Sequence, residues 1–246
     1  MKPGTKPAAA TNPALRDRAN EHPPHWSRER IKAWDDSEFH RMEPFITHTY
    51  WSDQESINIH RVVGTQHPDY QGKTWLEFLN GGKRMDINLS LHRSNPGYYL
   101  DTAPKKPAMH YVSLDGLDYY VSVDGHHRSC IAKFDFHYAG RTMLHGVTVV
   151  RHQVDWAFYH YYQALSGYAQ AHQLPFLFTP QNQLLSRDDT GGWKLDHYRP
   201  QLQVEDFLKN TKEILDCAQA LSLLTRLRAE AKERKDPRSW LRRLWK

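Results

Sequence analysis

The chain has 246 residues, with 33 Lys and Arg against 28 Asp and Glu, so its formal net charge is +5. This length can bury one sizeable core with appendages or form two small domains, and one core is expected. Two cysteines, Cys130 and Cys217, cannot build a disulfide framework, and no apolar run approaches the ~20 residues that cross a bilayer. The start of the chain lacks the apolar core of a signal peptide, so a cytoplasmic location is predicted.

The positive charge is concentrated at the two ends of the chain. Residues 226–246 hold nine Lys/Arg against three Asp/Glu, residues 1–34 hold seven against three, and residues 35–225 hold 17 against 22. Basic ends attract a polyanion such as nucleic acid, and salt weakens the attraction because bound counterions are released. The alternative is a pair of solvated ends that keep the protein in solution.

The beginning of the chain is rich in proline, alanine, threonine and asparagine and poor in large apolar groups, which is typical of disorder. Residues 1–34 are therefore expected to form a flexible basic tail. Residues 74–79 suit one or two helical turns before Gly81-Gly82. Three further segments are β-rich or alternate apolar with polar residues and predict strands: 45–51, 57–63 and 85–91.

The strongest local signal is a β-hairpin over residues 110–123. The pair Asp115-Gly116 separates two alternating runs, and it suits a tight turn because Gly accepts positive φ without steric cost. Residues 129–134 then resemble the first turns of a helix, and residues 143–150 return to strand character.

The last third of the chain is expected to be a mainly helical extension, residues 156–246. An aromatic-rich helix is predicted from Trp156 to His172, and short strand-like pieces follow around Gly191-Gly192. A long helix is predicted to start near Val204, with its apolar residues at helical spacing: Phe207, Leu208, Ile214, Leu215, Ala218, Leu221 and Leu224.

The turn from Asp124 to Arg128 joins the second strand of the hairpin to the next helix. A strand that ends in a Gly-containing turn and continues as a helix directs several backbone N–H groups, and the positive end of the helix dipole, at one point. Such a point suits phosphate. Arg128 adds a charged fork, His127 can donate a hydrogen bond, and Gly125 permits close approach. An ordinary Asp-Gly turn with surface histidines is the alternative.

Residues 118–132, Asp-Tyr-Tyr-Val-Ser-Val-Asp-Gly-His-His-Arg-Ser-Cys-Ile-Ala, resemble the signature of the ParB/sulfiredoxin superfamily: a strand, a Gly, His-Arg or Arg-Arg, and a helix. The match covers roughly residues 105–155 and extends upstream to about residue 55. It implies an α+β fold over residues 46–155, a mixed sheet with flanking helices, and a turn that holds the phosphates of ATP or CTP, usually with Mg²⁺. The nucleotide contacts that this resemblance implies are Gly125, His126, His127, Arg128 and Ser129.

Two departures from the superfamily pattern limit the activities that the resemblance implies. Sulfiredoxins have a catalytic Cys directly after the Gly, where this chain has His126, and Cys130 falls inside the predicted helix, so sulfinic acid reductase activity is not expected. Sulfiredoxins also add Lys, Ser and Thr contacts from an upstream helix. The candidates for those contacts here are Lys73, Thr74, Lys105 and Lys106. The helix-turn-helix of chromosomal ParB proteins is not found, so a standard partition clamp is not expected.

In character the chain is closest to plasmid-borne proteins of the oncogenic-suppression, or fertility-inhibition, type, whose members are associated with ATP hydrolysis and DNA cleavage. The resemblance therefore implies an NTPase that acts on DNA, with nuclease activity included, in a plasmid or mobile-element setting. The alternative is a non-catalytic, nucleotide-switched DNA-binding or regulatory module that acts on conjugation or partition machinery.

Candidate residues for catalysis and DNA binding are few. Asp124 is the carboxylate nearest the turn, and Asp101, Asp115 and Asp135 are alternatives if the fold brings them close. An Asp in a turn often bonds its own backbone instead. The basic C-terminal end, with Arg238, Arg242 and Arg243 among Trp and Leu, is expected to contact DNA, an anionic membrane surface or a protein partner. Sixteen histidines form no cluster with the spacing of a zinc site, so no protein-held metal is expected.

Overall fold

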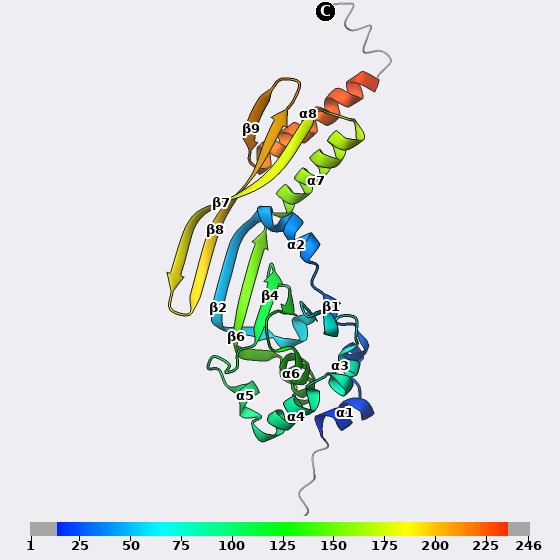
Figure 1. Ribbon diagram of the computed structural model, residues 1–246, viewed down its shortest axis with the longest axis vertical. Helices are drawn as coiled ribbons and strands as arrows, with labels where there is room; N and C mark the ends of the chain where they lie inside the picture. The colour runs from blue at the N-terminus through cyan, green and yellow to red at the C-terminus, as the bar shows by residue number, and fades with distance from the viewer. Residues whose placement is uncertain (1–13, 236–246) are drawn as a thin grey trace, which may run out of the picture. The chain divides into compact units, whose positions relative to one another are not determined.

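The computed structural model describes residues 14–235, and side chains up to residue 230. The fold is α+β with a mixed sheet, and the chain divides into two compact units (Figure 1). Strands β2 (Ile46–Asn58) and β6 (Met143–Val154) contribute residues to both. Unit 1 comprises Met1–Trp34, Ser52–Ser113 and Leu117–Val149, and unit 2 comprises Asp35–Trp51, Leu114–Gly116 and Val150–Lys246. None of the helices in the described part of the chain is long and apolar enough to cross a membrane.

The sheet of unit 1 has the strand order β1-β3-β5-β4-β6-β2. Its remaining strands are β1 (Lys32–Ala33), β3 (Val62–Thr65), β4 (His110–Leu114) and β5 (Asp118–Val121). The pairs β1–β3 and β3–β5 are parallel. Strands β4 and β5 form the predicted hairpin, and its turn residues Asp115 and Gly116 have φ of 54° and 71°, as a type I′ turn requires.

Helix α6 (His126–Ala139) is the central helix of unit 1. It packs against α1 (Leu15–Glu21), α3 (Trp75–Gly81) and α4 (Met85–Ser94). Its residues Ile131 and Phe134 are fully buried in the unit's apolar core. The short helices of the unit are α5 (Gly97–Leu100), η1 (His25–Arg28), η3 (Ile59–Arg61) and η4 (Pro68–Tyr70).

The described N-terminal residues, 14–34, differ from the flexible tail that composition predicts. They form α1, η1 and β1, and they bury Ala19, Trp26 and Ile31 in the core of unit 1. The physical reason is that a few large apolar side chains are enough to anchor a segment whose average composition is polar. Residues 1–13 lie outside the described part of the chain.

Residues 85–91, predicted as a strand, lie in the helix α4. The alternation of Met85, Ile87, Leu89 and Leu91 contains a pair four residues apart, Met85 and Leu89, and this pair is buried on one helix face. Ile87 and Leu91 are 63% and 60% exposed. The predicted strand over 57–63 is likewise divided, because β2 ends at Asn58 and η3 precedes β3.

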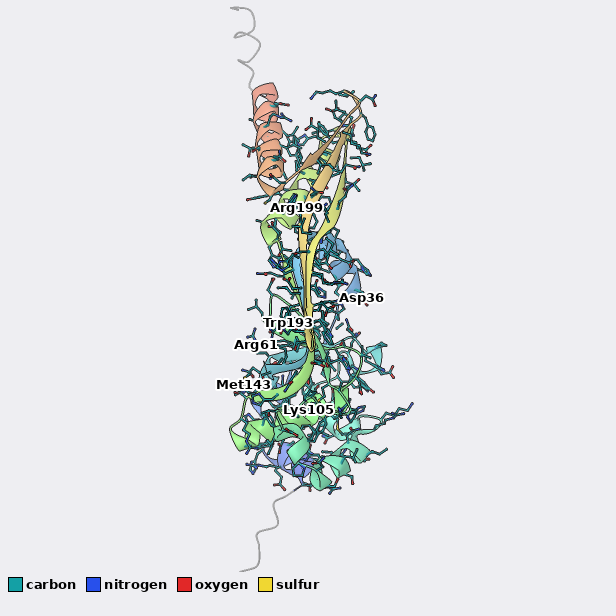
Figure 2. All side chains as sticks on the ribbon, turned by 90° about the vertical axis from the view of Figure 1, so that its left-hand side faces the viewer. Asp36, Arg61, Lys105, Met143, Trp193 and Arg199 are labelled. Carbon is teal, nitrogen blue, oxygen red and sulfur yellow. The ribbon has the colours of Figure 1, made fainter. Side chains whose placement is uncertain are left out.

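Unit 2 has a core of apolar residues from its sheet and its helices. Strand β8 (Trp193–Asp206) lies between β7 (Phe176–Thr190) and β9 (Thr211–Leu215) and is antiparallel to both, and Figure 2 shows Trp193 at its start. The core includes Phe45, Phe158 and Leu202. The helices of the unit are α2 (Asp36–Met42), η2 (Glu43–Phe45), α7 (Trp156–Ala171) and α8 (Cys217–Lys235).

The expectation of a mainly helical C-terminal region is wrong over much of its length. Helix α7 matches its prediction, and β7 and β8 lie where strand-like pieces are expected around Gly191-Gly192. These strands are long, however, with 15 and 14 residues, β9 follows them, and the last helix starts at Cys217 instead of near Val204. Phe207 and Leu208, expected on an apolar helix face, are 63% and 82% exposed in the turn between β8 and β9. That turn is stabilised by Asp206, whose Oδ1 accepts the backbone N–H groups of Leu208 and Lys209.

Candidate functional site

The candidate site lies in unit 1, where the chain passes from β5 into α6. Gly125 is the N-cap residue of α6 and has φ 108°, in the left-handed region that glycine adopts without steric cost. A Cβ at this position would lie 3.1 Å from Met109 Cβ and 3.2 Å from Met109 Cα. The sequence predicts that a ligand approaches the Gly125 backbone closely. In the structure, Met109 occupies that space.

The N-cap residue of α6, Gly125, makes no side-chain capping bond, and the carboxylate of Asp124 accepts its backbone N–H. The first N–H groups of an α-helix have no partner within the helix, and the helix dipole gives this end partial positive charge. The N-terminus of α6 is therefore suited to an anion, as the strand-turn-helix pattern predicts.

A cavity of about 440 Å³ lies over the start of α6. Besides the turn itself, its lining comes from α4, α5 and the segment before β4. The exposed cations Arg84 and Lys106 line it. Its apolar wall consists of Leu91, Tyr98 and Pro107.

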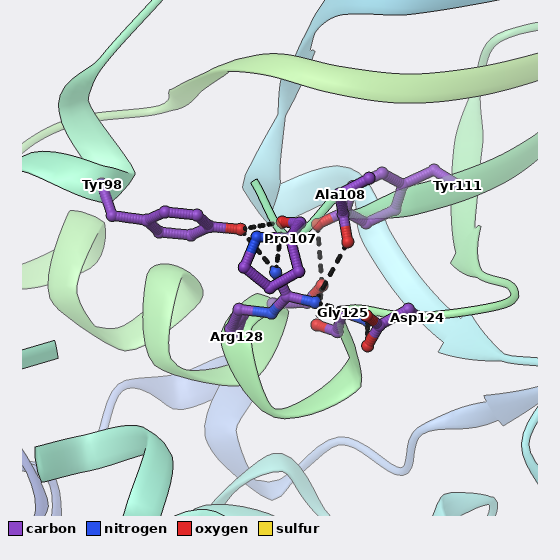
Figure 3. A network of polar contacts seen from close by, with 8 residues as sticks. Tyr98, Pro107, Ala108, Tyr111, Asp124, Gly125 and Arg128 are labelled. Carbon is purple, nitrogen blue, oxygen red and sulfur yellow. Dashed lines mark hydrogen bonds and ion pairs between the residues drawn. The ribbon is translucent and has the colours of Figure 1, made fainter. Parts of the chain in front are cut away.

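The guanidinium of Arg128 is held by the protein itself (Figure 3). Nη1 donates to the Tyr98 hydroxyl at 2.6 Å and to the Pro107 carbonyl, and Nη2 donates to the Ala108 carbonyl at 3.0 Å and to Asp124 Oδ2 at 2.7 Å. Four of its five N–H donors are thus used. Arg128 was expected to grip phosphate, but the structure shows it fastening the segment before β4 to α6.

Both carboxylate oxygens of Asp124 are also engaged. Oδ1 accepts the backbone N–H of Gly125 at 2.6 Å, and Oδ2 accepts from Arg128. Burial alone would raise the pKa of Asp124, but the hydrogen bond and the charge of Arg128 outweigh it and hold the pKa below its ordinary value. Asp124 is therefore ionised at neutral pH. Its bond to the neighbouring Gly125 N–H matches the turn role given above as the alternative to catalysis.

His126 is nine-tenths buried, and its Nδ1 lies 2.9 Å from Thr65 Oγ1. Thr65 Oγ1 also accepts the backbone N–H of His67, and when the Thr65 hydroxyl donates its own proton to Nδ1 the ring hydrogen of His126 lies on Nε2. Burial, together with the nearby charge of His67, lowers the pKa of His126 to about 4. The ring is therefore neutral at pH 7, and its buried Nε2 has no partner among the described residues.

His127 packs against the rings of Tyr70 and Phe78, with ring centroids 5.3 Å and 5.1 Å away. Burial lowers its pKa, and its buried Nε2 also has no partner within the described part of the chain. His126 and His127 both line the cavity.

Ser129 and Cys130 lie below the cavity and not in its wall. Ser129 is fully buried, donates to the Gly125 carbonyl at 2.8 Å and lies 2.7 Å from the Tyr111 hydroxyl. It was expected to contact nucleotide, but its position makes it a support of the turn. Cys130 lies inside the helix, as predicted; burial raises its pKa, and its Sγ contacts the Trp75 carbonyl at 3.6 Å.

Of the four upstream candidates, Lys106 alone lines the cavity. Thr74 caps α3 in a capping box, and Lys105 is buried with its Nζ donating to the Asp101 carbonyl at 2.6 Å. Arg84 and Tyr98 also line the cavity, and no sequence pattern predicts this: Arg84 precedes a segment that alternates like a strand, and Tyr98 lies outside every predicted element. The DNA-binding candidates Arg238, Arg242 and Arg243 lie outside the described residues.

The residues of the cavity do not form a site for magnesium. Asp124 is the single carboxylate among its lining residues in the described part of the chain, and both of its oxygens already have partners. Magnesium requires oxygen ligands, usually carboxylates and phosphates. No group of three or more His, Cys, Asp or Glu suited to a metal occurs among residues 14–230.

The geometry therefore shows a cavity suited to an anion, lined by the neutral His126 and His127 and by an arginine that the protein itself holds. The resemblance to the ParB/sulfiredoxin superfamily rests on the turn motif alone. Comparisons of the chain with protein-family models, with curated proteins and with solved structures found no match, so the relationship to that superfamily stays a prediction.

Proposed function

We propose that the protein binds a nucleotide such as ATP or CTP in this cavity, with the phosphates at the start of α6. One observation carries the proposal: the uncapped N-terminus of a 14-residue helix and two exposed cations, Arg84 and Lys106, line the same cavity of about 440 Å³. A volume of this size lies within the range of small-molecule sites.

The charge of the cavity supports an anionic ligand. Arg84, Lys106 and Arg128 supply three cations against Asp124, the single carboxylate among the described lining residues, and His126 and His127 are neutral at pH 7. Unit 1 as a whole contains 17 Lys/Arg against 12 Asp/Glu. A phosphate chain would be attracted to this side of the cavity, while Leu91 and Tyr98 offer an apolar surface to the base.

The same geometry favours binding over hydrolysis. Hydrolysis needs a group that orients or deprotonates water, and Asp124, the single carboxylate among the described lining residues, has a pKa below its ordinary value and is a weak base. We therefore favour a ParB/sulfiredoxin-like module in which nucleotide is a switch ligand, acting on DNA or on conjugation or partition machinery. The DNA part of this proposal depends on the basic composition of residues 226–246.

Isothermal titration calorimetry with ATP, CTP and GTP, with and without magnesium, tests the proposal. Arg84→Gln and Lys106→Gln are each expected to weaken nucleotide binding about three- to tenfold, because each removes one cation from the cavity. Arg93→Gln is the matched control, since Arg93 is exposed on the same helix, α4, and does not line the cavity. It is expected to bind as the wild type does.

Two results would count against this function. Absence of binding heat with all three nucleotides would remove the nucleotide proposal. If Arg93→Gln lost as much nucleotide affinity as Arg84→Gln, the binding would be general attraction by a basic surface and not recognition by the cavity. A phosphate-release assay decides between binding and hydrolysis: nucleotide-dependent release that Arg84→Gln abolishes would replace the switch with an NTPase. Arg128→Ala is a poor probe, because Arg128 holds the wall of the cavity together.

A further inference from the structure

The carboxylate of Asp124 occupies the position at which a phosphate would bind. Its two oxygens accept from Gly125 N–H at 2.6 Å and from Arg128 Nη2 at 2.7 Å, at the start of α6. Backbone N–H groups at a helix N-terminus and an arginine fork are the usual donors to phosphate oxygens. The side chain of Asp124 is 56% exposed, so a ligand in the cavity would meet it directly.

A second feature of the same place calls for a ligand. His126 is nine-tenths buried and lines the cavity, and its Nε2 lacks a partner among the described residues. A buried polar atom without a partner carries a free-energy cost of desolvation, which a hydrogen bond to a bound oxygen removes. Asp124 does not satisfy this nitrogen, although it lies two residues away.

We propose that Asp124 determines which phosphate ligands the site accepts: in the free protein it holds Arg128 as an internal anion, and a bound phosphate replaces it at Arg128 Nη2. This inference deepens the proposed function and rests on it. Asp124 remains ionised after it gives up Arg128, so it repels the incoming phosphate. The site therefore disfavours free polyphosphates and accepts ligands whose charge is partly neutralised, such as a magnesium-complexed nucleotide.

The contacts of Arg128 allow one substitution to isolate this effect. In Asp124→Asn the amide oxygen can still accept from Gly125 N–H, but the amide nitrogen cannot accept from Arg128. The guanidinium keeps its bonds to Tyr98, Pro107 and Ala108, so it stays in place with one N–H donor released. The substitution thus removes a negative charge and exposes a donor without loosening the cavity wall.

The opposite role for Asp124 predicts the opposite result. If Asp124 bound magnesium or activated water, Asp124→Asn would weaken the binding of magnesium-ATP or abolish turnover. If Asp124 is an internal anion, the substitution strengthens binding, and it does so more for ATP without magnesium, which carries more negative charge than the magnesium complex.

The experiment is calorimetry on the full chain with two probes, ATP in EDTA and ATP with excess magnesium. Asp124→Asn is expected to tighten the binding of ATP in EDTA about tenfold and that of magnesium-ATP by a smaller factor. Asp86→Asn is the charge-matched control: Asp86 is 85% exposed on α4, pairs with Arg16 and does not line the cavity. It is expected to leave both affinities unchanged.

The possible outcomes separate this inference from the function on which it rests. If wild type binds nucleotide and Asp124→Asn binds no more tightly, the inference fails and nucleotide binding stands. If neither protein binds either probe, the proposed function fails. Thermal melting checks that Asp124→Asn is folded. If it is not folded, Asp124→Ser replaces it in the same titrations, because serine also keeps an oxygen beside Gly125 N–H. Weaker binding of magnesium-ATP by a folded variant would overturn the inference in favour of a metal-binding carboxylate.

Discussion

Gly125 and Gly140 flank α6 at its two ends, and both have left-handed φ, 108° and 66°. They differ in the space around them: a Cβ on Gly125 would meet Met109 at 3.1 Å, whereas a Cβ on Gly140 would have no atom within 4 Å. The pair therefore separates the cost of the backbone conformation from the cost of a collision.

We expect Gly125→Ala to lower the free energy of unfolding by about 2–4 kcal/mol, since left-handed strain of about 1–2 kcal/mol adds to overlap with Met109. Gly140→Ala is expected to lower it by about 1 kcal/mol, from strain alone. Urea denaturation followed by circular dichroism measures both. Equal losses in the two variants would show that the contact with Met109 is not what requires glycine at 125.

At the scale of elements, Arg128 connects three parts of unit 1. It joins α6 to Tyr98 of α5 and to the carbonyls of Pro107 and Ala108, which precede β4 (Figure 3). Arg128→Met is expected to lower the free energy of unfolding by about 2–4 kcal/mol, because the four hydrogen bonds of a largely buried guanidinium are lost. Guanidinium chloride denaturation measures this difference.

Arg141→Met is the control for this prediction, since Arg141 is an exposed arginine that follows the same helix. Arg141→Met is expected to change the free energy of unfolding by no more than about 0.5 kcal/mol. If Arg128→Met were as stable as Arg141→Met, the hydrogen bonds of Arg128 would contribute little to the fold, and its guanidinium would be free to serve a ligand instead.

The sequence predicts best those elements that begin or end at a turn or capping residue. The Asp115-Gly116 turn marks the hairpin, Gly125 marks the start of α6, and Asp155, whose side chain accepts the N–H of Phe158, marks the start of α7. Helix α4 has no such marker: its N-cap residue Arg84 makes no side-chain capping bond. Its short alternating run fits a strand as well as a helix.

At the scale of the whole molecule, the N-terminal segment is part of unit 1. Trp26 is 7% exposed, its ring centroid lies 4.7 Å from that of Phe134, and Lys133 Nζ lies 5.1 Å from its ring centroid. We expect Trp26→Ala to lower the free energy of unfolding by about 3–5 kcal/mol, as for other large buried side chains.

Trp193→Ala provides the comparison, because Trp193 is 37% exposed at the start of β8 in unit 2. Trp193→Ala is expected to lower the free energy of unfolding by about 1 kcal/mol or less. Thermal and urea denaturation of the two variants measure the difference. If Trp26→Ala lowered the free energy of unfolding only slightly, residues 14–34 would not be anchored in unit 1, and the flexible tail predicted from their composition would be the better description.

The sequence by itself determined the hairpin, the turn that opens α6, the strand β6 and the helix α7, because each is specified by neighbours within a few residues. It also brought Gly125, His126, His127 and Arg128 to one place, since four consecutive residues cannot lie far apart. Their presence in one cavity lining followed from this local geometry.

Only the tertiary structure decided what those residues do. The partners of Arg128 are 4, 20, 21 and 30 residues away along the chain, so no local pattern reveals that its donors are occupied. The same holds for Arg84, which reaches the cavity because α4 packs against α6. Burial of Trp26 and the extended path of β8 through Val204 also depend on distant contacts, whose energy outweighs local composition and periodicity.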